Sequence, residues 1–128
     1  MIKISVIIPV YNEEKTVIDL LKIVKKQTGL KVDIEVIVVN DGSVDNSLRI
    51  LEENKHLFDK LINLEKNSGK GAAIKKGIAS ANGEYILFQD ADLEYDPKDY
   101  FQLIEPILRF NADLVLGSRL VGSQITRV

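Results

Sequence analysis

Short, almost continuously apolar runs alternate along this chain with longer segments in which apolar residues recur every three or four positions. The runs are rich in Val and Ile, which is typical of strands that are covered on both faces of a sheet. This alternation predicts an α/β domain with a mainly parallel, Rossmann-like sheet and helices on both of its faces. Strands are predicted at residues 2–10, 34–40, 61–65, 85–89 and 113–117.

The longer segments predict the helices. Their expected ranges are 13–26, 46–53, 71–81 and 99–110. In the first helix the apolar residues form one stripe that would face the core, made of Val17, Leu20, Leu21 and Val24. Pro97 stands at or just before the start of the last helix, where a missing N–H costs little. After Arg119 neither a helix nor a strand is predicted, and we expect a domain that is cut off there.

Composition narrows the class of protein. With 128 residues and a hydrophobic content of 45%, the chain is about the size of one domain with an ordinary core. The net charge of −2 creates no overall field that would recruit nucleic acid. The sequence has no Cys, so there is no disulfide framework, and no apolar run approaches the roughly 20 residues of a membrane span. A soluble chain is therefore expected, and the lack of Cys fits a reducing, cytoplasmic compartment. Membrane association of the full-length protein stays open.

Polar clusters follow three of the predicted strands, at residues 11–13, 41–43 and 90–92. Ligands of open α/β sheets bind beyond the carboxyl ends of the strands, so one cleft could collect all three clusters. In an extended chain the Cα atoms of Asp90 and Asp92 would lie about 6–7 Å apart on the same side. Paired carboxylates of this kind hold a hard divalent cation and leave positions for a diphosphate. The pattern indicates a metal-assisted phosphate site.

The acidic stretch also has a simpler interpretation. Acidic residues after a strand can form a solvated turn that caps the next helix, with Asp96 as the N-cap before Pro97. Asp45 is likewise assigned to a helix cap. For the segment 90–92, the residues alone leave the metal site and the solvated turn both open.

The segment 67–71, Asn-Ser-Gly-Lys-Gly, lacks the GxxxxGK[ST] spacing of a P-loop, which excludes that motif. Its small residues still allow the backbone to approach a nucleotide, and Lys70 at a helix start would attract phosphate groups. Lys75 and Lys76 are assigned to a solvated helix face, and His56 to a structural or exposed position.

Five segments in order carry a family resemblance. They are VIIPVYNEE at 6–14, VVNDGSVD at 38–45, NSGKGAA at 67–73, GEYILFQDAD at 83–92 and GSR at 117–119. Together they resemble the inverting family-2 glycosyltransferases, which have the GT-A fold. The DAD-x-E and GSR segments are most similar to polyprenol-phosphate sugar synthases, such as dolichyl-phosphate mannosyltransferase.

The resemblance implies a role for each matching residue. Nucleotide binding is assigned to Pro9, Tyr11, Glu13, Asp41, Lys70, Asp90 and Ala91. Binding of Mg²⁺ or Mn²⁺ is assigned to Asp90, Asp92 and Glu94. Catalysis is assigned to Asp90, Asp92 and Arg119, with Arg119 near the phosphates because its guanidinium suits bidentate contacts.

The implied reaction moves a sugar from a UDP- or GDP-linked donor to an acceptor, with inversion and metal assistance. A polyprenyl phosphate at a membrane surface is the implied acceptor. Residues 1–128 would then be the nucleotide-sugar-binding part of the domain, without the acceptor half. A non-catalytic module that binds nucleotide remains the alternative, and the sequence does not choose between UDP and GDP.

Overall fold

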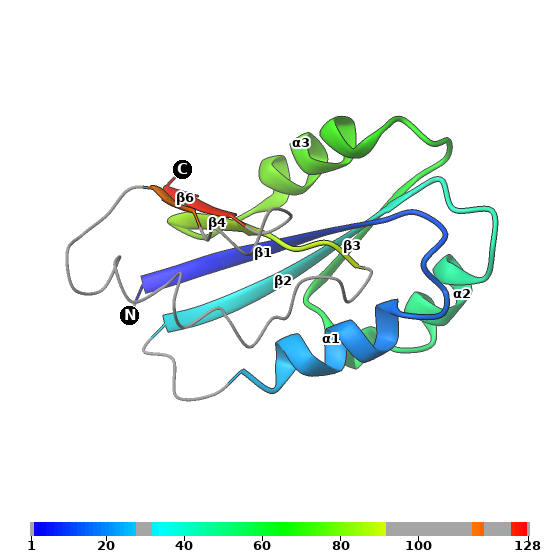
Figure 1. Cartoon of the computed structure of the whole chain (residues 1–128), viewed down its shortest axis with the longest axis horizontal. Helices are drawn as coiled ribbons and strands as arrows, with labels where there is room; N and C mark the ends of the chain where they lie inside the picture. Colours follow the sequence, from blue (N-terminus) through cyan, green and yellow to red (C-terminus); the bar gives the residue numbers. More distant parts are fainter. Residues whose placement is uncertain (1, 28–31, 92–113, 117–123, 128) are drawn as a thin grey trace.

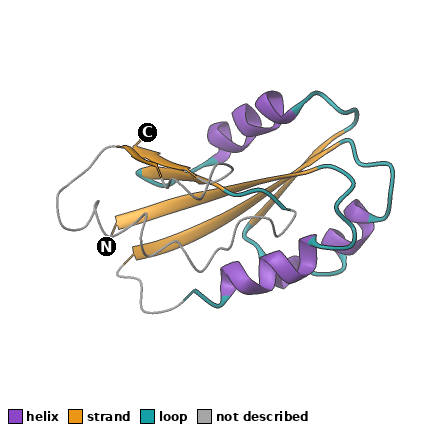
Figure 2. Ribbon diagram, viewed as in Figure 1, coloured by secondary structure: helices purple, strands orange, loops and turns teal. Residues whose placement is uncertain are grey.

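The computed structural model describes residues 2–27, 32–91, 114–116 and 124–127. In this part the chain forms one six-stranded sheet with helices on both faces (Figures 1 and 2). The elements are β1 (Ile2–Val10), α1 (Val17–Lys25), β2 (Val32–Asp41), α2 (Ser47–Glu52), the 3-10 helix η1 (Lys55–Leu57), β3 (Lys60–Leu64), α3 (Lys70–Ser80), β4 (Tyr85–Phe88), β5 (Leu114–Leu116) and β6 (Gln124–Arg127). The predicted α/β class with a mainly parallel sheet is confirmed.

The strand order is β3-β2-β1-β4-β6-β5. From β1 to β3 the chain moves outward on one side, and it then returns to place β4 on the other side of β1. All pairings among β1, β2, β3 and β4 are parallel, so these four strands end at the same edge. The reversal of direction between β1 and β4 is a topological switch point, which is where open α/β sheets bind ligands.

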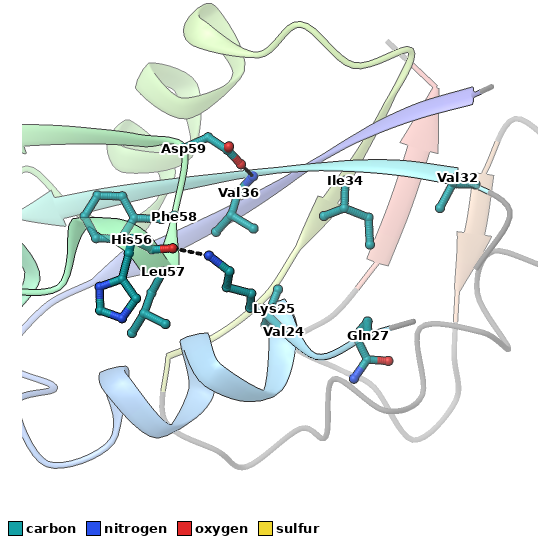
Figure 3. A pocket seen from close by; sticks show the side chains of 10 residues that line it. All are labelled: Val24, Lys25, Gln27, Val32, Ile34, Val36, His56, Leu57, Phe58 and Asp59. Atoms are coloured by element: carbon teal, nitrogen blue, oxygen red, sulfur yellow. Dashed lines mark hydrogen bonds between the residues drawn. The ribbon is translucent and has the colours of Figure 1, made fainter. Parts of the chain in front are cut away.

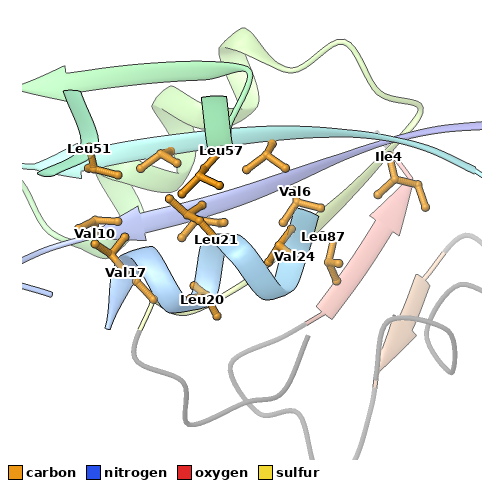
Figure 4. Close-up of a cluster of buried hydrophobic side chains, with 14 of the residues drawn as sticks. Ile4, Val6, Val10, Val17, Leu20, Leu21, Val24, Leu51, Leu57 and Leu87 are labelled. Atoms are coloured by element: carbon orange, nitrogen blue, oxygen red, sulfur yellow. The ribbon is translucent and has the colours of Figure 1, made fainter. Parts of the chain in front are cut away.

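Successive side chains of β1 enter two different cores, because strand side chains alternate between the faces. On one face, Ile4, Val6, Ile8 and Val10 pack with α1, α2 and η1 (Figure 4). The predicted stripe of α1, Val17 to Val24, belongs to this core. Burial of each such side chain stabilises the fold by about 1.5–3 kcal/mol.

The opposite face of the sheet is covered by α3. Here Ile7 of β1 and Ile37 and Val39 of β2 pack against Ala73. The contact is close, since a Cβ added to Gly77 would lie 2.6 Å from Cγ2 of Ile7. Small residues on the inner side of α3 therefore allow the helix to lie directly on the sheet.

The predicted start of the first helix is wrong. Residues 13–16 form a turn, in which the Thr16 and Val17 N–H groups both donate to the Glu13 carbonyl oxygen, and α1 begins at Val17. The reason is tertiary: the Glu13 N–H donates to Ser47 Oγ and the Glu14 N–H to Asp45 Oδ2. These bonds to the next loop hold the segment outside the helix.

The expectation of no closing element after Arg119 is also wrong, because Gln124–Arg127 forms β6. This strand is antiparallel to both of its neighbours, β4 and β5. Four residues are too few to show a period, and pairing with the sequence-distant β4 decides their conformation. The helix predicted at 99–110, together with Asp96 and Pro97, lies outside the described residues.

The face of the sheet that α3 covers also contains a buried carboxylate, that of Glu35. Glu35 of β2 accepts hydrogen bonds from Ser5 Oγ at 2.9 Å and from the Asn82 N–H at 2.9 Å. The Asn82 side chain donates to its other oxygen, and the Lys60 ammonium lies 3.6 Å from that oxygen. Burial raises the pKa of Glu35, but the hydrogen bonds from Asn82 and Ser5 and the charge of Lys60 outweigh it, so the pKa is lowered. Glu35 thus fixes the connection between α3 and β4.

Candidate functional site

A cavity of about 330 Å³ opens at the carboxyl ends of β1, β2 and β4, at the switch point. Its lining residues are Pro9, Val10, Tyr11, Glu13, Asp41, Asn67, Gly69, Lys70, Asp90 and Ala91. The expected convergence of the three polar clusters in one cleft is confirmed. All seven residues to which the sequence assigned nucleotide binding line this cavity. Of the other predicted site residues, Asp92, Glu94 and Arg119 lie outside the described part of the chain.

A second cavity, of about 310 Å³, lies between the end of α1, β2 and η1 (Figure 3). Two of its charged groups have partners within the chain: the Lys25 ammonium donates to the His56 carbonyl, and Asp59 Oδ2 accepts from the Val36 N–H at 2.7 Å. His56 is exposed at its edge, as predicted. None of the predicted binding residues lines this cavity, so the switch-point cavity is the candidate site.

Asp41, the last residue of β2, is only 3% exposed and holds the neighbouring loop. Its Oδ1 accepts from the Ser68 N–H at 2.8 Å and its Oδ2 from the Gly69 N–H at 3.1 Å. The Asn67 side chain donates to its carbonyl oxygen at 3.3 Å. This positioning task comes in addition to any contact with a ligand, and sequence reasoning missed it.

Gly42 follows directly under the same loop. Its φ is +66°, in the left-handed region that glycine adopts without steric cost. A Cβ at this position would lie 2.2 Å from the Asn67 backbone nitrogen. The left-handed backbone and the close approach of the loop are thus two separate reasons for glycine at position 42.

Lys70 is the first residue of α3, and its ammonium forms an ion pair with Oδ1 of Asp90. The Lys70 side chain is 56% exposed and that of Asp90 is 19% exposed. The amino end of the helix adds partial positive charge at the same place. Cation, helix terminus and carboxylate therefore share one wall of the cavity. Lys75 and Lys76, farther along α3, are exposed as predicted.

Thr16 connects the first and last parts of the site. Its hydroxyl donates to the Ala91 carbonyl at 2.8 Å and lies 3.3 Å from Glu13 Oε2. The backbone that follows β4 is thereby held against the beginning of α1. The sequence offered no signal for this role, because Thr16 falls outside the polar clusters.

Asp45 begins the segment that leads into α2. Its Oδ1 accepts from the Ser47 N–H at 2.9 Å, and its Oδ2 accepts from the Glu14 N–H at 3.3 Å. Burial raises the pKa of Asp45, but the hydrogen bonds from Ser47 and Glu14 outweigh it, so the pKa is lowered. The predicted cap is wrong in its position, because the N-cap of α2 is Asn46, which makes no side-chain cap hydrogen bond. From one residue earlier, Asp45 still accepts the first N–H of α2.

The cavity suits a ligand that has both phosphate groups and a polar ring. Lys70 and the start of α3 offer positive charge, while Glu13 and Asp41 offer acceptor oxygens. Within the described residues, no three His, Cys, Asp or Glu side chains gather to hold a metal ion. Asp90 still fits a divalent cation, because Mg²⁺ is usually held by one or two carboxylates together with substrate phosphates.

Known proteins resemble this chain in sequence and in structure. The family model described as "Glycosyl transferase family 2" matches residues 5–127. The undecaprenyl-phosphate 4-deoxy-4-formamido-L-arabinose transferase of Proteus mirabilis is 40% identical over 80% of the chain, which covers 32% of that protein. The dolichyl-phosphate beta-glucosyltransferase of Dictyostelium discoideum is 34% identical over 97% of the chain, which covers 42% of that protein. The chain thus spans less than half the length of either relative.

Among solved structures, TarS residues 1–349 of Staphylococcus aureus in complex with UDP superimposes with a TM-score of 0.75. The sequences are 34% identical, and the match covers 88% of this chain and 34% of the TarS chain. Among the residues that the structure describes, no helix is long and apolar enough to span a membrane.

Proposed function

Because this chain belongs to glycosyl transferase family 2 and has the GT-A fold, we propose that it binds a nucleoside diphosphate sugar in the switch-point cavity and takes part in transfer of the sugar. The observation that carries the proposal is the convergence of Tyr11, Glu13, Asp41, Lys70 and Asp90 on one cavity. The UDP complex of TarS supports the nucleotide part.

Each group in the cavity has a matching part of the ligand. The Tyr11 ring is 45% exposed, which leaves a face for stacking on a base. Glu13 and Asp41 supply acceptors for donors of the ribose and base. Lys70 and the amino end of α3 supply positive charge for the diphosphate. Pro9 and Ala91 contribute apolar or backbone surface between these groups.

A divalent cation, Mg²⁺ or Mn²⁺, is part of the proposal. Asp90 would hold it together with Asp92 and Glu94, which follow in the sequence. When bound, such an ion acts as a Lewis acid for the leaving diphosphate. The Asp90 side chain is 19% exposed at the cavity wall, and Lys70, its ion-pair partner among the described residues, can move to a phosphate instead.

For the acceptor, we propose a polyprenyl phosphate at a membrane surface. The two relatives from P. mirabilis and D. discoideum carry undecaprenyl phosphate and dolichyl phosphate in their names, which supports this choice. A phosphate is already anionic at neutral pH and needs no general base, in contrast to a hydroxyl acceptor. It needs cations, and Arg119 is the proposed one. Attack from the face opposite the diphosphate would invert the anomeric centre.

The domain proposal is that residues 1–128 supply the donor-binding part of this reaction. Calorimetric titration with UDP and GDP, each with and without Mn²⁺, tests it on the purified chain. We expect one nucleotide to bind in a metal-dependent manner, and Asp90→Asn and Asp92→Asn to abolish the metal dependence. Asp19→Asn, at an exposed carboxylate of α1, is the matched control and should bind like wild type. A folded chain that binds neither nucleotide contradicts the proposed function.

A further inference from the structure

Asn12 lies between two lining residues of the cavity, Tyr11 and Glu13, and does not itself line it. Its φ is +53°, and it is the only non-glycine residue with positive φ in the described part of the chain. A side chain other than Asn, Asp or Gly rarely adopts this conformation. Position 12 therefore carries a backbone constraint at the edge of the site.

The Asn12 side chain bonds to a different loop. Its Oδ1 accepts from the Val44 N–H at 2.9 Å and from the Asp45 N–H at 3.4 Å. Its own N–H donates to Ser43 Oγ at 3.0 Å. Asn12 thus bonds twice over to the segment after β2, about thirty residues away: its side-chain oxygen accepts from backbone N–H groups, and its own N–H donates to a side-chain hydroxyl.

Further bonds continue the same contact on both sides. The Glu13 N–H donates to Ser47 Oγ, and the Asn46 N–H donates to Glu14 Oε2 at 3.1 Å. Directly before this segment, Asp41 at the end of β2 accepts hydrogen bonds from the N–H groups of residues 68 and 69. Residues 41–47 therefore link the loop after β1 with the loop before α3, and Asn12 is the main attachment on the β1 side.

We propose that Asn12 is a positioning residue that fixes the loop of Tyr11 and Glu13 against residues 43–45 and thereby sets nucleotide affinity without touching the nucleotide. The inference rests on the proposed function, because it concerns the affinity of that same cavity. A loop that is already ordered gives tighter binding, because less conformational entropy is lost when the ligand binds.

Asparagine meets both requirements of position 12, a left-handed backbone and a side-chain acceptor oxygen. Glycine would keep the left-handed backbone and lose the acceptor oxygen. Aspartate would keep the backbone and the acceptor, but it would add a negative charge beside Asp45 and Glu14, whose carboxylates are part of the same contact. Alanine would lose the acceptor and strain the backbone as well.

The test compares Asn12→Gly, Asn12→Asp and wild type in the purified chain, with Val44→Ala as the control. Val44 is 85% exposed, and its substitution leaves its N–H bond to Asn12 intact. UDP and GDP affinities are measured by calorimetry with Mn²⁺. Amide hydrogen exchange of Val44 and Asp45 is followed by NMR without nucleotide, and the thermal midpoint is recorded for each variant.

We expect Asn12→Gly to lower the affinity about three- to tenfold and to accelerate exchange at Val44 and Asp45, with a thermal midpoint close to that of wild type. Asn12→Asp should restore most of the protection and most of the affinity, and Val44→Ala should match wild type in both. If Asn12→Gly also lowers the thermal midpoint, the Asn12→Asp variant decides: recovery of affinity together with the midpoint supports the proposal, and recovery of the midpoint alone overturns it.

Wild-type affinity in a folded Asn12→Gly chain overturns the inference and leaves the proposed function intact. A wild-type chain that binds no nucleotide contradicts the proposed function, and the exchange measurement still decides whether Asn12 holds the two loops together: unchanged exchange in Asn12→Gly overturns that part too.

Discussion

The ammonium of Lys70 and the carboxylate of Asp90 neutralise each other across the wall of the candidate site, 20 positions apart in the sequence. Both groups are the ones that a metal-bound diphosphate would need. A diphosphate competes with Asp90 for Lys70, and a divalent cation competes with Lys70 for Asp90. Each ligand would therefore free the binding partner of the other, which predicts that nucleotide and metal promote each other's binding.

Replacement of Lys70 tests this relationship. Lys70→Met should weaken UDP or GDP binding about five- to tenfold. This effect is smaller than the roughly 1.5–3 kcal/mol of a hydrogen bond to a charged group, because the Lys70 side chain is more than half exposed and water screens its charge. Binding of Mn²⁺ alone should strengthen by up to about fivefold, because Asp90 loses its competing cation. Calorimetry measures both. Lys75→Met, an exposed lysine of the same helix, should change neither; equal effects of the two substitutions would contradict a specific role for Lys70.

Asp41→Asn should damage the loop over the site. Each carboxylate oxygen accepts one backbone N–H, and an amide would turn an NH₂ group toward one of these donors. We expect a loss of about 1–3 kcal/mol in the free energy of unfolding, measured in urea. Nucleotide affinity should fall at least about tenfold, since Asp41 lines the cavity and holds Gly69 there. Asp33→Asn, at the exposed start of β2, is the control; a stability loss of the same size in both variants would refute the account.

Gly42 and Gly71 differ sharply in whether they tolerate a side chain. Gly42→Ala should destabilise the fold by about 2–4 kcal/mol, because φ is +66° and the new Cβ would lie 2.2 Å from the Asn67 nitrogen. Gly71→Ala, in the first turn of α3, meets no atom within 4 Å and should stabilise it by about 0.5–1 kcal/mol. Chemical denaturation of both variants checks the opposite signs. A neutral Gly42→Ala would mean that the loop of residues 66–69 can shift freely.

The stability of the chain should depend on Glu35 at acid pH. Its pKa is lowered in the folded state, so its contribution is present above the ordinary carboxyl pKa and is lost as the pH falls through the folded value. Glu35→Gln should cost about 1–3 kcal/mol near pH 7, because one acceptor oxygen becomes a donor.

The measurement is urea unfolding of wild type and Glu35→Gln between pH 7 and pH 3. The difference between the two proteins should shrink as the pH falls, since the protonated Glu35 resembles glutamine. Asp45 is a second carboxylate with a lowered pKa, so Asp45→Asn is unfolded over the same pH range. The pH dependence that Asp45 contributes can then be subtracted from that of the wild type. A difference that stays constant down to pH 3 would show that the charge of Glu35 does not stabilise the fold.

Local patterns predicted much of this molecule. The stripe from Val17 to Val24 and the apolar runs identified α1 and the strands, because burial on one helix face or on both sheet faces leaves a period in the sequence. The convergence of Tyr11, Asp41 and Asp90 was also predictable, since parallel strands end at one edge of a sheet. The roles of Asp92, Glu94 and Arg119 remain proposals.

Contacts between distant segments leave no periodic pattern in the sequence from which they could be predicted. The turn before α1 arises because Glu13 and Glu14 bond to residues 45–47, and β6 arises because Gln124–Arg127 pairs with β4. The hold of Asp41 on Ser68 and Gly69, and of Asn12 on Val44, depends on which loop the fold brings within hydrogen-bond distance.

Periodicity and the direction of parallel strands were thus enough to predict most strands and helices of the described residues and the polar residues that gather at the carboxyl edge, but not β6 or the start of α1. The way that edge is held together follows from the tertiary contacts alone. A hydrogen bond between residues about thirty positions apart depends on ångström-scale placement of two backbones, and neither partner's local sequence contains that distance.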